Sequence, residues 1–212
     1  MIKAIIFDFD GVIVESVQVK TDAFAEIYHP YGQDVMQKVI KHHEAHGGIS
    51  RFEKFKLYHK EFLGIDLTKQ KIEKMSKKFS NLVLEKVISA PYVKGSYEFI
   101  SKHNHNYDFF ISSATPKDEI LKIVKARGLL KFFKGVYGSP KKKDEHVQQI
   151  LNRKNYKEYE VVFIGDAHSD RNAAKVNNIE FIARIQSKES CLFDEKNKIN
   201  DLRNIRHTII NL

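Results

Sequence analysis

Short runs of branched and aromatic apolar residues recur along the chain, separated by segments long enough to form helices. Apolar runs of this length, bounded by turn residues, are typical of strands buried on both faces. Their alternation with helical segments predicts a Rossmann-like α/β fold, in which helices flank a parallel sheet. The predicted strands are residues 2–7, 107–112, 161–164 and 180–185.

Residues 16–90 differ, because no run among them predicts a strand. Their apolar side chains recur at helical spacing instead. Since a bare loop of this length is improbable in a compact domain, we expect an all-helical inserted subdomain. We therefore assign 1–15 and 91–212 to the sheet domain, with Pro91 at the return point. Three apolar groups predict the helices: Phe24, Ile27, Tyr28 and Tyr31; Phe52, Phe55, His59 and Phe62; and Ile72, Met75, Phe79, Leu82 and Val83.

Length and composition fit one domain that carries a large insertion, since 212 residues with 42% hydrophobic content can bury a substantial core. No stretch approaches the roughly 20 consecutive apolar residues of a membrane helix, and the N-terminus does not resemble a signal peptide. Cys191 is the single cysteine, which excludes internal disulfides and thiolate-rich zinc sites. We expect a cytoplasmic protein without membrane association.

The net charge of +9 makes nucleic acid a partner to consider. The lysines are spread over nearly every predicted helix, however. The tightest run, Lys141–Lys143, lacks the interleaved aromatic residues on which single-stranded bases stack. We expect a solvated lysine-rich surface that also attracts anionic substrates, and no nucleic-acid partner.

Two aspartates, Asp8 and Asp10, end the first predicted strand and lie two positions apart. Side chains alternate between the faces of a strand, so both carboxylates point the same way. At about 6.6 Å, two strand rises, and an effective dielectric constant near 20, their repulsion is about 2.5 kcal/mol. A compensating positive charge is therefore expected.

A second acidic pair follows the strand predicted at 161–164, in the segment GDAHSD, which contains Asp166 and Asp170. Ligands of open parallel sheets bind at the carboxyl ends of the strands, where the turns converge. We expect Asp8, Asp10, Asp166 and Asp170 to gather at this edge. An all-oxygen site of this kind suits Mg²⁺, which would supply the missing charge.

Two other turns offer groups that bind anions. Ser112 and Ser113 end the strand predicted at 107–112, just before a helix whose N-terminal amides can receive an anion. One lysine of the run Lys141–Lys143 lies at the next crossover. Together these groups predict a phosphate pocket beside an aspartate nucleophile, with a second carboxylate as acid and base.

The four segments, in this order, resemble the haloacid dehalogenase-like (HAD) superfamily. DFDG matches its first motif, Ser113 its second, a lysine after Gly-Ser-Pro its third, and GDAHSD its fourth. The resemblance covers residues 1 to about 185 and implies a HAD-like core. The helical insertion is similar to the cap of the branch that holds phosphoglycolate phosphatase and beta-phosphoglucomutase.

The resemblance implies a role for each matching residue. Asp8 would attack phosphorus, and Asp10 would protonate the leaving oxygen and then activate water. Mg²⁺ would be held by Asp8 and Asp166, by the Asp10 main-chain carbonyl, and by Asp170 directly or through water. Phosphate oxygens would contact Ser113 and a lysine. Lys143 is the lysine of choice because it begins a helix, with Lys141 and Lys142 as open alternatives.

Other positions refine this interpretation. The dehalogenases of the superfamily lack an acid two residues after the nucleophile, so Asp10 favours phosphoryl chemistry. Val12 and Glu15 stand where many relatives have Thr and Asp. In the insertion, HGGISRFEKF resembles the substrate-contacting cap loop of the mutase, and we expect Arg51 to reach over the substrate when the cap closes. The alternative for Arg51 is a solvated side chain at a helix start.

The interpretation that combines these observations is a Mg²⁺-dependent phosphatase of a small phosphorylated metabolite. A phosphomutase of a sugar phosphate is the nearest alternative, and a non-enzymatic nucleic-acid-binding protein a remote one. His42, His43 and His46 lack HExxH spacing and are expected at a polar helix end rather than around zinc. The segment 187–206 is charged and weakly patterned and receives no role.

Overall fold

The computed structural model describes residues 1–187 and 190–212. Residues 188 and 189, part of the segment without an assigned role, lie outside the described residues. The strands are β1 (Ala4–Phe7), β2 (Asp108–Pro116), β3 (Phe133–Ser139), β4 (Val161–Gly165), β5 (Glu180–Arg184) and β6 (Lys198–Ile199). The helices are α1 (Val17–Tyr28), α2 (Gln33–Ala45), α3 (Arg51–Leu63), α4 (Lys69–Ser89), α5 (Ser96–His103), α6 (Lys117–Ala126), α7 (Lys143–Lys154), α8 (His168–Val176) and α9 (Ile205–Ile210).

The six strands form one parallel sheet in the order β3-β2-β1-β4-β5-β6, which confirms the predicted Rossmann-like α/β fold. β1 lies at the centre, where Ala4 is in register with Asp108 of β2 and Val161 of β4. Since all strands are parallel, their carboxyl ends meet at one edge of the sheet. The residues that follow β1 and β4 are therefore brought together.

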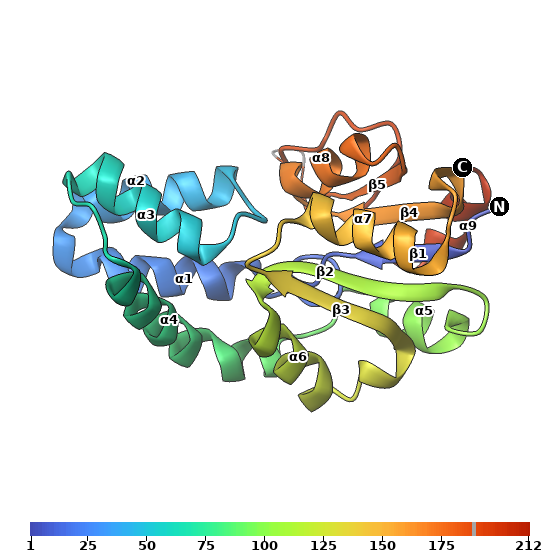
Figure 1. The fold of residues 1–212 in the computed structure, drawn as a ribbon, viewed down its shortest axis with the longest axis horizontal. Coiled ribbons are helices and arrows are strands. Elements are labelled where there is room, and N and C mark those ends of the chain that lie inside the picture. The colour runs from blue at the N-terminus through green and yellow to red at the C-terminus, as the bar shows by residue number, and fades with distance from the viewer. Residues whose placement is uncertain (188–189) are drawn as a thin grey trace.

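Helices cover both faces of the sheet, α7 and α8 on one side and α5 and α6 on the other (Figure 1). Successive residues of β1 alternate between these layers. Ile5 and Phe7 belong to the core formed with α5 and α6, whereas Ala4 and Ile6 pack with α7 and α8. All four residues are fully buried, which explains why the sequence shows a continuous apolar run rather than an alternating one.

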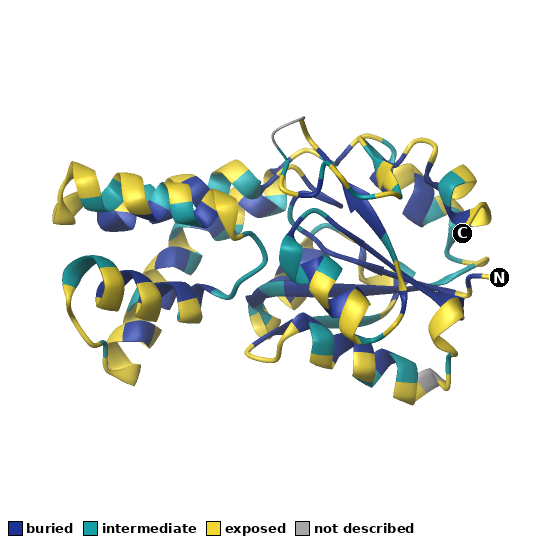
Figure 2. Ribbon diagram, turned by 90° about the horizontal axis from the view of Figure 1, so that it is seen from above, coloured by how far each residue is buried: buried dark blue, intermediate teal, exposed yellow. Residues whose placement is uncertain are grey.

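Helices α1 to α4 lie between β1 and β2 in sequence and form a separate bundle beside the sheet (Figure 1). Its interior is aromatic: the ring of Phe24 lies 5.6 Å from that of Phe55 and 4.7 Å from that of Phe79. Buried residues accordingly face the inside of the bundle and exposed ones its outer surface (Figure 2). His43 lies in the last turn of α2, as predicted, but its side chain is buried within the bundle rather than at a polar surface.

Two arginines of the sheet domain hold the points at which the chain enters and leaves the insertion. Arg184 of β5 pairs with Glu15 at 2.7 Å. Glu15, which stands where many relatives have Asp, therefore has an ion-pair partner in the sheet domain. Arg127, just after α6, donates hydrogen bonds to three main-chain carbonyls at the end of α4, those of Val87, Ile88 and Ala90. Both connections between the insertion and the sheet domain are therefore held by an arginine of the sheet domain.

The strands at the sheet edges depart most from the sequence prediction. β3 and β6 are not predicted, and β2 extends beyond residue 112 to Pro116. β3 is an edge strand that pairs with β2, and much of it is only partly buried. Its sequence FKGVYGS accordingly contains a lysine and two glycines among its apolar residues. Edge strands of this kind lack the continuous apolar run that identifies a central strand.

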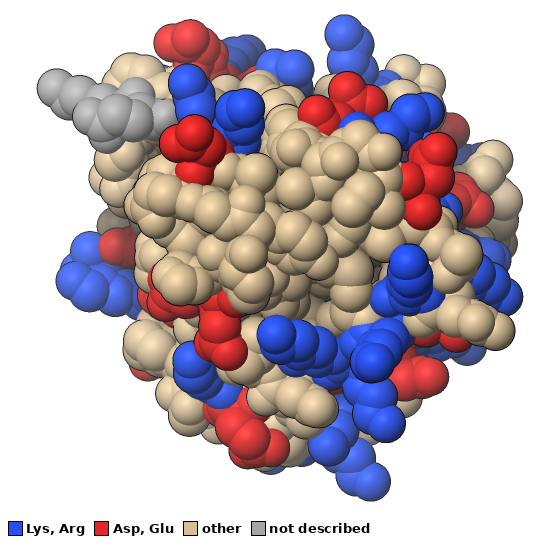
Figure 3. Space-filling model, turned by 90° about the vertical axis from the view of Figure 1, so that its left-hand side faces the viewer, with Lys and Arg blue, Asp and Glu red and all other residues tan. Residues whose placement is uncertain are grey.

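The surface carries charges of both signs. On the end of the molecule formed by the helical insertion, Lys and Arg side chains lie among Asp and Glu around the rim, and the centre is occupied by other residues (Figure 3). Within the described ranges, no helix combines the length and apolarity that crossing a membrane requires.

Candidate active site

Three of the four predicted acids come together at the carboxyl edge of the sheet. Asp8 follows β1, Asp166 follows β4, and Asp170 lies in the first turn of α8. One carboxylate oxygen of each lies within 4.8 Å of the others. Asp8 and Asp170 are buried and Asp166 is half-buried. The topology therefore places three carboxylates from two strand ends in one small volume.

Lys143 supplies a positive charge to this group. Its Nζ lies 2.8 Å from Oδ2 of Asp8 and 2.5 Å from Oδ1 of Asp170, and its side chain is buried. Lys141 and Lys142, the two alternatives that the sequence leaves open, are exposed. α7 begins at Lys143, and this start directs the side chain toward the acids. Only this lysine of the run contacts the predicted nucleophile.

Burial controls the protonation of these groups. Burial raises the pKa of Asp8, with Asp170 and Asp10 adding to the effect and Lys143 opposing it. Burial also raises the pKa of Asp166, assisted by the charges of Asp8 and Asp170. For Lys143, Asp170 and Asp8 outweigh burial and raise the pKa of the amine. A further positive charge near Asp8 and Asp166 would lower the pKa of both and favour their ionised forms.

The glycine of DFDG makes room for this arrangement. A Cβ atom on Gly11 would lie 2.0 Å from Oδ2 of Asp166, closer than any side chain can approach. The backbone at Gly11 also has a φ of +78°, which favours glycine. The motif therefore needs glycine here for the two acidic segments to meet.

The carboxylate of Asp10 points away from the three gathered acids, toward the helical insertion. It accepts hydrogen bonds from Ser16 Oγ, at 2.6 Å, and from Thr115 Oγ1, at 3.4 Å, and it pairs with Lys20 of α1. Burial opposes its ionisation, but Lys20 and Ser16 outweigh burial and hold the pKa of Asp10 below its usual value. In this conformation Asp10 is therefore a carboxylate in contact with the insertion.

The two predicted serines lie within β2 and are both buried. Ser113 Oγ accepts a hydrogen bond from the main-chain amide of Thr115 at 3.1 Å, which leaves its hydroxyl proton available to a ligand. Ser112 instead contacts Nδ1 of His146 at 2.9 Å. Of the two, Ser113 lines a pocket beside the acids, as described below.

Arg51 is not solvated, contrary to the alternative considered for it. Its guanidinium forms a two-point ion pair with Glu119 of α6, with Nη2 at 2.5 Å and Nη1 at 3.0 Å from the carboxylate oxygens. Ser80 of α4 accepts another hydrogen bond at 2.8 Å. The arginine therefore joins the helical insertion to the sheet domain in this conformation. The sequence contains no local signal for the partner, Glu119.

Two hollows flank the acids. The central cavity, about 130 Å³, lies between the acids and the insertion and is lined by Asp8, Asp10, Asp166, Lys20 and residues of α3. The side pocket, about 320 Å³, lies on the other side of the loop Gly47–Ser50. Both are lined by Gly48, Ile49 and Ala114.

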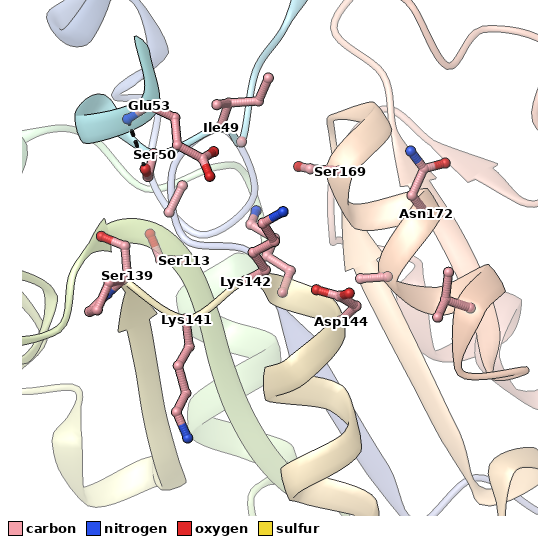
Figure 4. Close-up of a pocket in the computed structure, with 16 residues that line it drawn as sticks. Ile49, Ser50, Glu53, Ser113, Ser139, Lys141, Lys142, Asp144, Ser169 and Asn172 are labelled. Atoms are coloured by element: carbon pink, nitrogen blue, oxygen red, sulfur yellow. Dashed lines mark hydrogen bonds between the residues drawn. The ribbon is translucent and has the colours of Figure 1, made fainter. Parts of the chain in front are cut away.

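The side pocket gathers hydroxyl groups near Lys143. Ser113, Ser139 and Ser169 face it from three different segments, whereas the side chain of Lys141 points away (Figure 4). Ser139 and Ser169 each carry a buried hydroxyl oxygen with no hydrogen-bond partner in the described part of the chain. These hydroxyls are therefore available to bind a ligand's oxygens.

The donor set fits a hard divalent cation. Asp8, Asp166 and Asp170 offer carboxylate oxygens alone, and cations such as Mg²⁺ prefer oxygen ligands. The carboxylate of Asp10 is turned toward Lys20 and is not one of the three. Lys143 already neutralises part of the charge, so an ion would complete the balance for three carboxylates.

Sequence reasoning missed several residues of the site. No sequence pattern identifies Lys20 and Thr115, which contact Asp10, or Lys54 of α3, which lines the central cavity. Helical spacing predicts apolar positions, so it gives no reason to place a lysine inside the bundle.

Comparison with solved structures finds other proteins that share this fold. A beta-phosphoglucomutase from Clostridium difficile is 19% identical, with 100% of this chain and 98% of that chain covered and a TM-score of 0.79. A predicted phosphoglycolate phosphatase from Haemophilus somnus is 15% identical, with 100% and 98% covered and a TM-score of 0.75. The putative HAD-hydrolase YfnB from Bacillus subtilis, bound to magnesium, is 17% identical, with 100% and 99% covered and a TM-score of 0.71.

No curated protein matched the sequence of this chain. The family described as haloacid dehalogenase-like hydrolase, in contrast, has a sequence model that matches residues 5–184. This range begins in β1 and ends with β5, so it includes the helical insertion and every predicted site residue. The chain belongs to the haloacid dehalogenase-like hydrolase family.

Proposed function

We propose that this protein is a Mg²⁺-dependent phosphatase that hydrolyses the phosphate monoester of a small metabolite. The observation that carries the proposal is the contact between Asp8 and Lys143. A buried carboxylate able to attack phosphorus lies 2.8 Å from an amine able to hold phosphate oxygens. Family membership supports hydrolysis, and the hydroxyls of Ser113, Ser139 and Ser169 add donors for a phosphoryl group.

In the proposed reaction, an oxygen of Asp8 attacks phosphorus while the bond from phosphorus to the ester oxygen breaks. Asp10 gives its proton to the leaving oxygen and then takes a proton from the water that attacks the aspartyl phosphate. Phosphate leaves and Asp8 is regenerated. The lowered pKa of Asp10 suits the second step, in which it acts as a base, and the acid step requires its contact with Lys20 to be released.

The metal proposal rests on the three gathered carboxylates. Asp8, Asp166 and Asp170 would hold Mg²⁺, with the main-chain carbonyl of Asp10 as a further ligand. When bound, the ion would neutralise charge on the phosphoryl oxygens. Lys143 and Ser113 would orient those oxygens.

The helical insertion would act as a cap that excludes water and selects the substrate. We propose Arg51 as a substrate contact from this cap. Arg51 lines the central cavity and forms a two-point ion pair with Glu119. A phosphate or carboxylate of the substrate could take the place of Glu119 in such a pair.

Closure of the cap can be tested at Gly48, whose loop lies against α8. A Cβ atom on Gly48 would lie 1.9 Å from Ser169 Oγ, at a φ of +73°. We expect Gly48→Ala to displace the loop and lower kcat/KM by about 100-fold, since a shift of about 1 Å can cost that much. Phosphate release measured over a range of substrate concentrations would report the loss.

Gly64→Ala is the matched control for Gly48→Ala. Gly64 has a similar φ of +67°, but a Cβ atom there would meet nothing within 4 Å. It therefore carries the same backbone strain without the collision. Equal losses of kcat/KM in the two variants would show that strain, rather than contact between the loop and α8, is responsible.

Hydrolysis of p-nitrophenyl phosphate tests the proposed function directly. We expect phosphate release in the presence of Mg²⁺, loss of activity when EDTA removes the ion, and recovery when Mg²⁺ is returned. Hydrolysis that is unaffected by EDTA would contradict the metal proposal. Absence of hydrolysis both of this ester and of a panel of sugar, nucleotide and organic-acid phosphates would contradict the phosphatase proposal.

A phosphomutase is the second candidate, because a beta-phosphoglucomutase shares the fold over the whole chain. In that reaction a second hydroxyl of a sugar phosphate, instead of water, would accept the phosphoryl group. Measuring isomer formation beside phosphate release separates the two reactions. Isomer formation that greatly exceeds phosphate release would favour the mutase.

We propose a small phosphorylated metabolite as the partner and no nucleic acid. The mixture of acidic and basic side chains around the end of the cap supports this choice, since nucleic acid requires a continuous basic surface (Figure 3). Salt-dependent binding to random DNA would contradict it.

A further inference from the structure

The central cavity contains three cationic side chains from the cap, and two of them are neutralised by the protein. Lys20 pairs with Asp10, and Arg51 pairs with Glu119. Lys54 of α3 differs, because no carboxylate among the described residues lies within 4 Å of its amine. The cavity wall therefore has one cationic side chain without an acidic partner.

Lys54 is placed deep inside the protein, with only 2% of the residue exposed. Its Nζ lies 2.7 Å from Nδ1 of His43 and 5.7 Å from the centre of the Phe24 ring. Burial, assisted by the charge of Lys20, lowers the pKa of Lys54 to about 7. Burial likewise lowers the pKa of His43, which keeps this imidazole neutral and able to accept from the amine.

A buried amine without a counter-ion is costly to the folded state, and apolar side chains usually fill such positions. Lys54 could instead find its counter-ion in the cavity that it shares with Asp8 and Asp10. Glu44 also lines this cavity, but its side chain is exposed and lies beyond 4 Å of Lys54. An anion that enters would favour the protonated amine and form a strong pair, because little water surrounds it.

We propose that Lys54 binds a second anionic group, a carboxylate or a second phosphate, on the alcohol part of the substrate. The proposal rests on the phosphatase function proposed above and narrows its substrate class. Asp8 would react with one phosphate at the floor of the cavity, and Lys54 would hold the other charge at the cap side. The cavity volume of about 130 Å³ is below that of pockets for drug-sized ligands, which favours a small substrate.

Three esters with one carbon skeleton test the proposal. Glycerol 3-phosphate has a neutral end, 3-phosphoglycerate has a carboxylate, and glycerol 1,3-bisphosphate has a second phosphate. We expect the wild-type protein to prefer at least one of the two doubly anionic esters by 10-fold or more in kcat/KM. Which of them is preferred distinguishes a carboxylate from a phosphate.

Lys54→Met should lower kcat/KM for the preferred doubly anionic ester by about 10- to 100-fold and leave glycerol 3-phosphate within about 3-fold. Lys56→Met, an exposed lysine two positions further along α3, is the matched control and should change neither. Equal losses for all three esters in Lys54→Met would indicate a structural role and overturn the proposal. Thermal unfolding of both variants would show whether they remain folded.

Wild-type kinetics keep the proposal testable even if Lys54→Met does not fold. The wild-type protein could hydrolyse p-nitrophenyl phosphate and yet show no preference for either doubly anionic ester, or fail to hydrolyse both. Either result would overturn the role of Lys54 and leave the phosphatase proposal intact. Absence of hydrolysis of every phosphate ester would overturn both.

Discussion

Replacement of Asp8 by asparagine is expected to reduce phosphate release by about 10⁴-fold or more. The substitution keeps the shape of the side chain and removes the oxygen that forms the bond to phosphorus, and loss of a covalent nucleophile typically has effects of this size. Oδ1 of Asp8 accepts from the amide of Phe9 at 2.7 Å, a contact that asparagine can keep. The measurement is hydrolysis of p-nitrophenyl phosphate with Mg²⁺, with circular dichroism to verify folding.

Asp22→Asn serves as the control for the nucleophile. Asp22 lies on the exposed face of α1, where its carboxylate accepts from Gln18 at 2.8 Å, so its loss should leave turnover unchanged. If Asp8→Asn retains Mg²⁺-dependent hydrolysis within 10-fold of the wild-type rate, Asp8 is not the nucleophile.

Lys143→Met is expected to have the largest effect on stability. The substitution removes the amine that lies between Asp8 and Asp170 and leaves two buried carboxylates without their cation. Breaking a buried pair in this way costs about 3–5 kcal/mol of unfolding free energy. For a chain of this size, the midpoint of thermal unfolding in buffer without divalent ions should fall by about 6–20 °C.

The adjacent lysines provide the comparison for Lys143. Lys141→Met and Lys142→Met alter exposed side chains, so each should change the unfolding free energy by no more than about 0.5 kcal/mol. Added Mg²⁺ should recover part of the loss in Lys143→Met by supplying charge to the same carboxylates. A wild-type midpoint for Lys143→Met, or an equal loss in Lys142→Met, would show that Lys143 does not compensate the acids.

The sequence predicts the central part of this fold well because burial on both faces leaves continuous apolar runs at β1, β2, β4 and β5. The acids that end β1 and β4 could be placed at one edge from the parallel topology alone. β3 could not be predicted, since an edge strand exposes polar residues and glycine among its apolar ones.

The pairing of charges was beyond sequence reasoning. The chain has 36 Lys and Arg residues, and nothing local distinguishes those that turn inward. The predicted helix start favours Lys143 over its two neighbours, but the burial of its side chain depends on how α7 packs. Glu119 and Arg51 meet across 68 positions of the chain, and Lys54 is buried on a helix whose spacing predicts only apolar contacts. These placements follow from tertiary packing rather than from periodicity.

The two connections between the sheet domain and the insertion, at Glu15 and Pro91, suggest how the protein could be re-engineered. β1 and β2 are direct neighbours, so the hydrogen-bonded ladder from Ala4 to Phe7 closes without help from residues 16–90. The hydrogen bonds that Arg127 donates to the end of α4 go to main-chain oxygens, and these are offered by any helix that ends at the same place. A foreign helical module grafted between Glu15 and Pro91 could therefore be attached in the same way, provided that it brings one cation for Glu119 and another for Asp10. Selectivity could then be exchanged as a unit, while the contacts of Lys143 with Asp8 and Asp170 are kept.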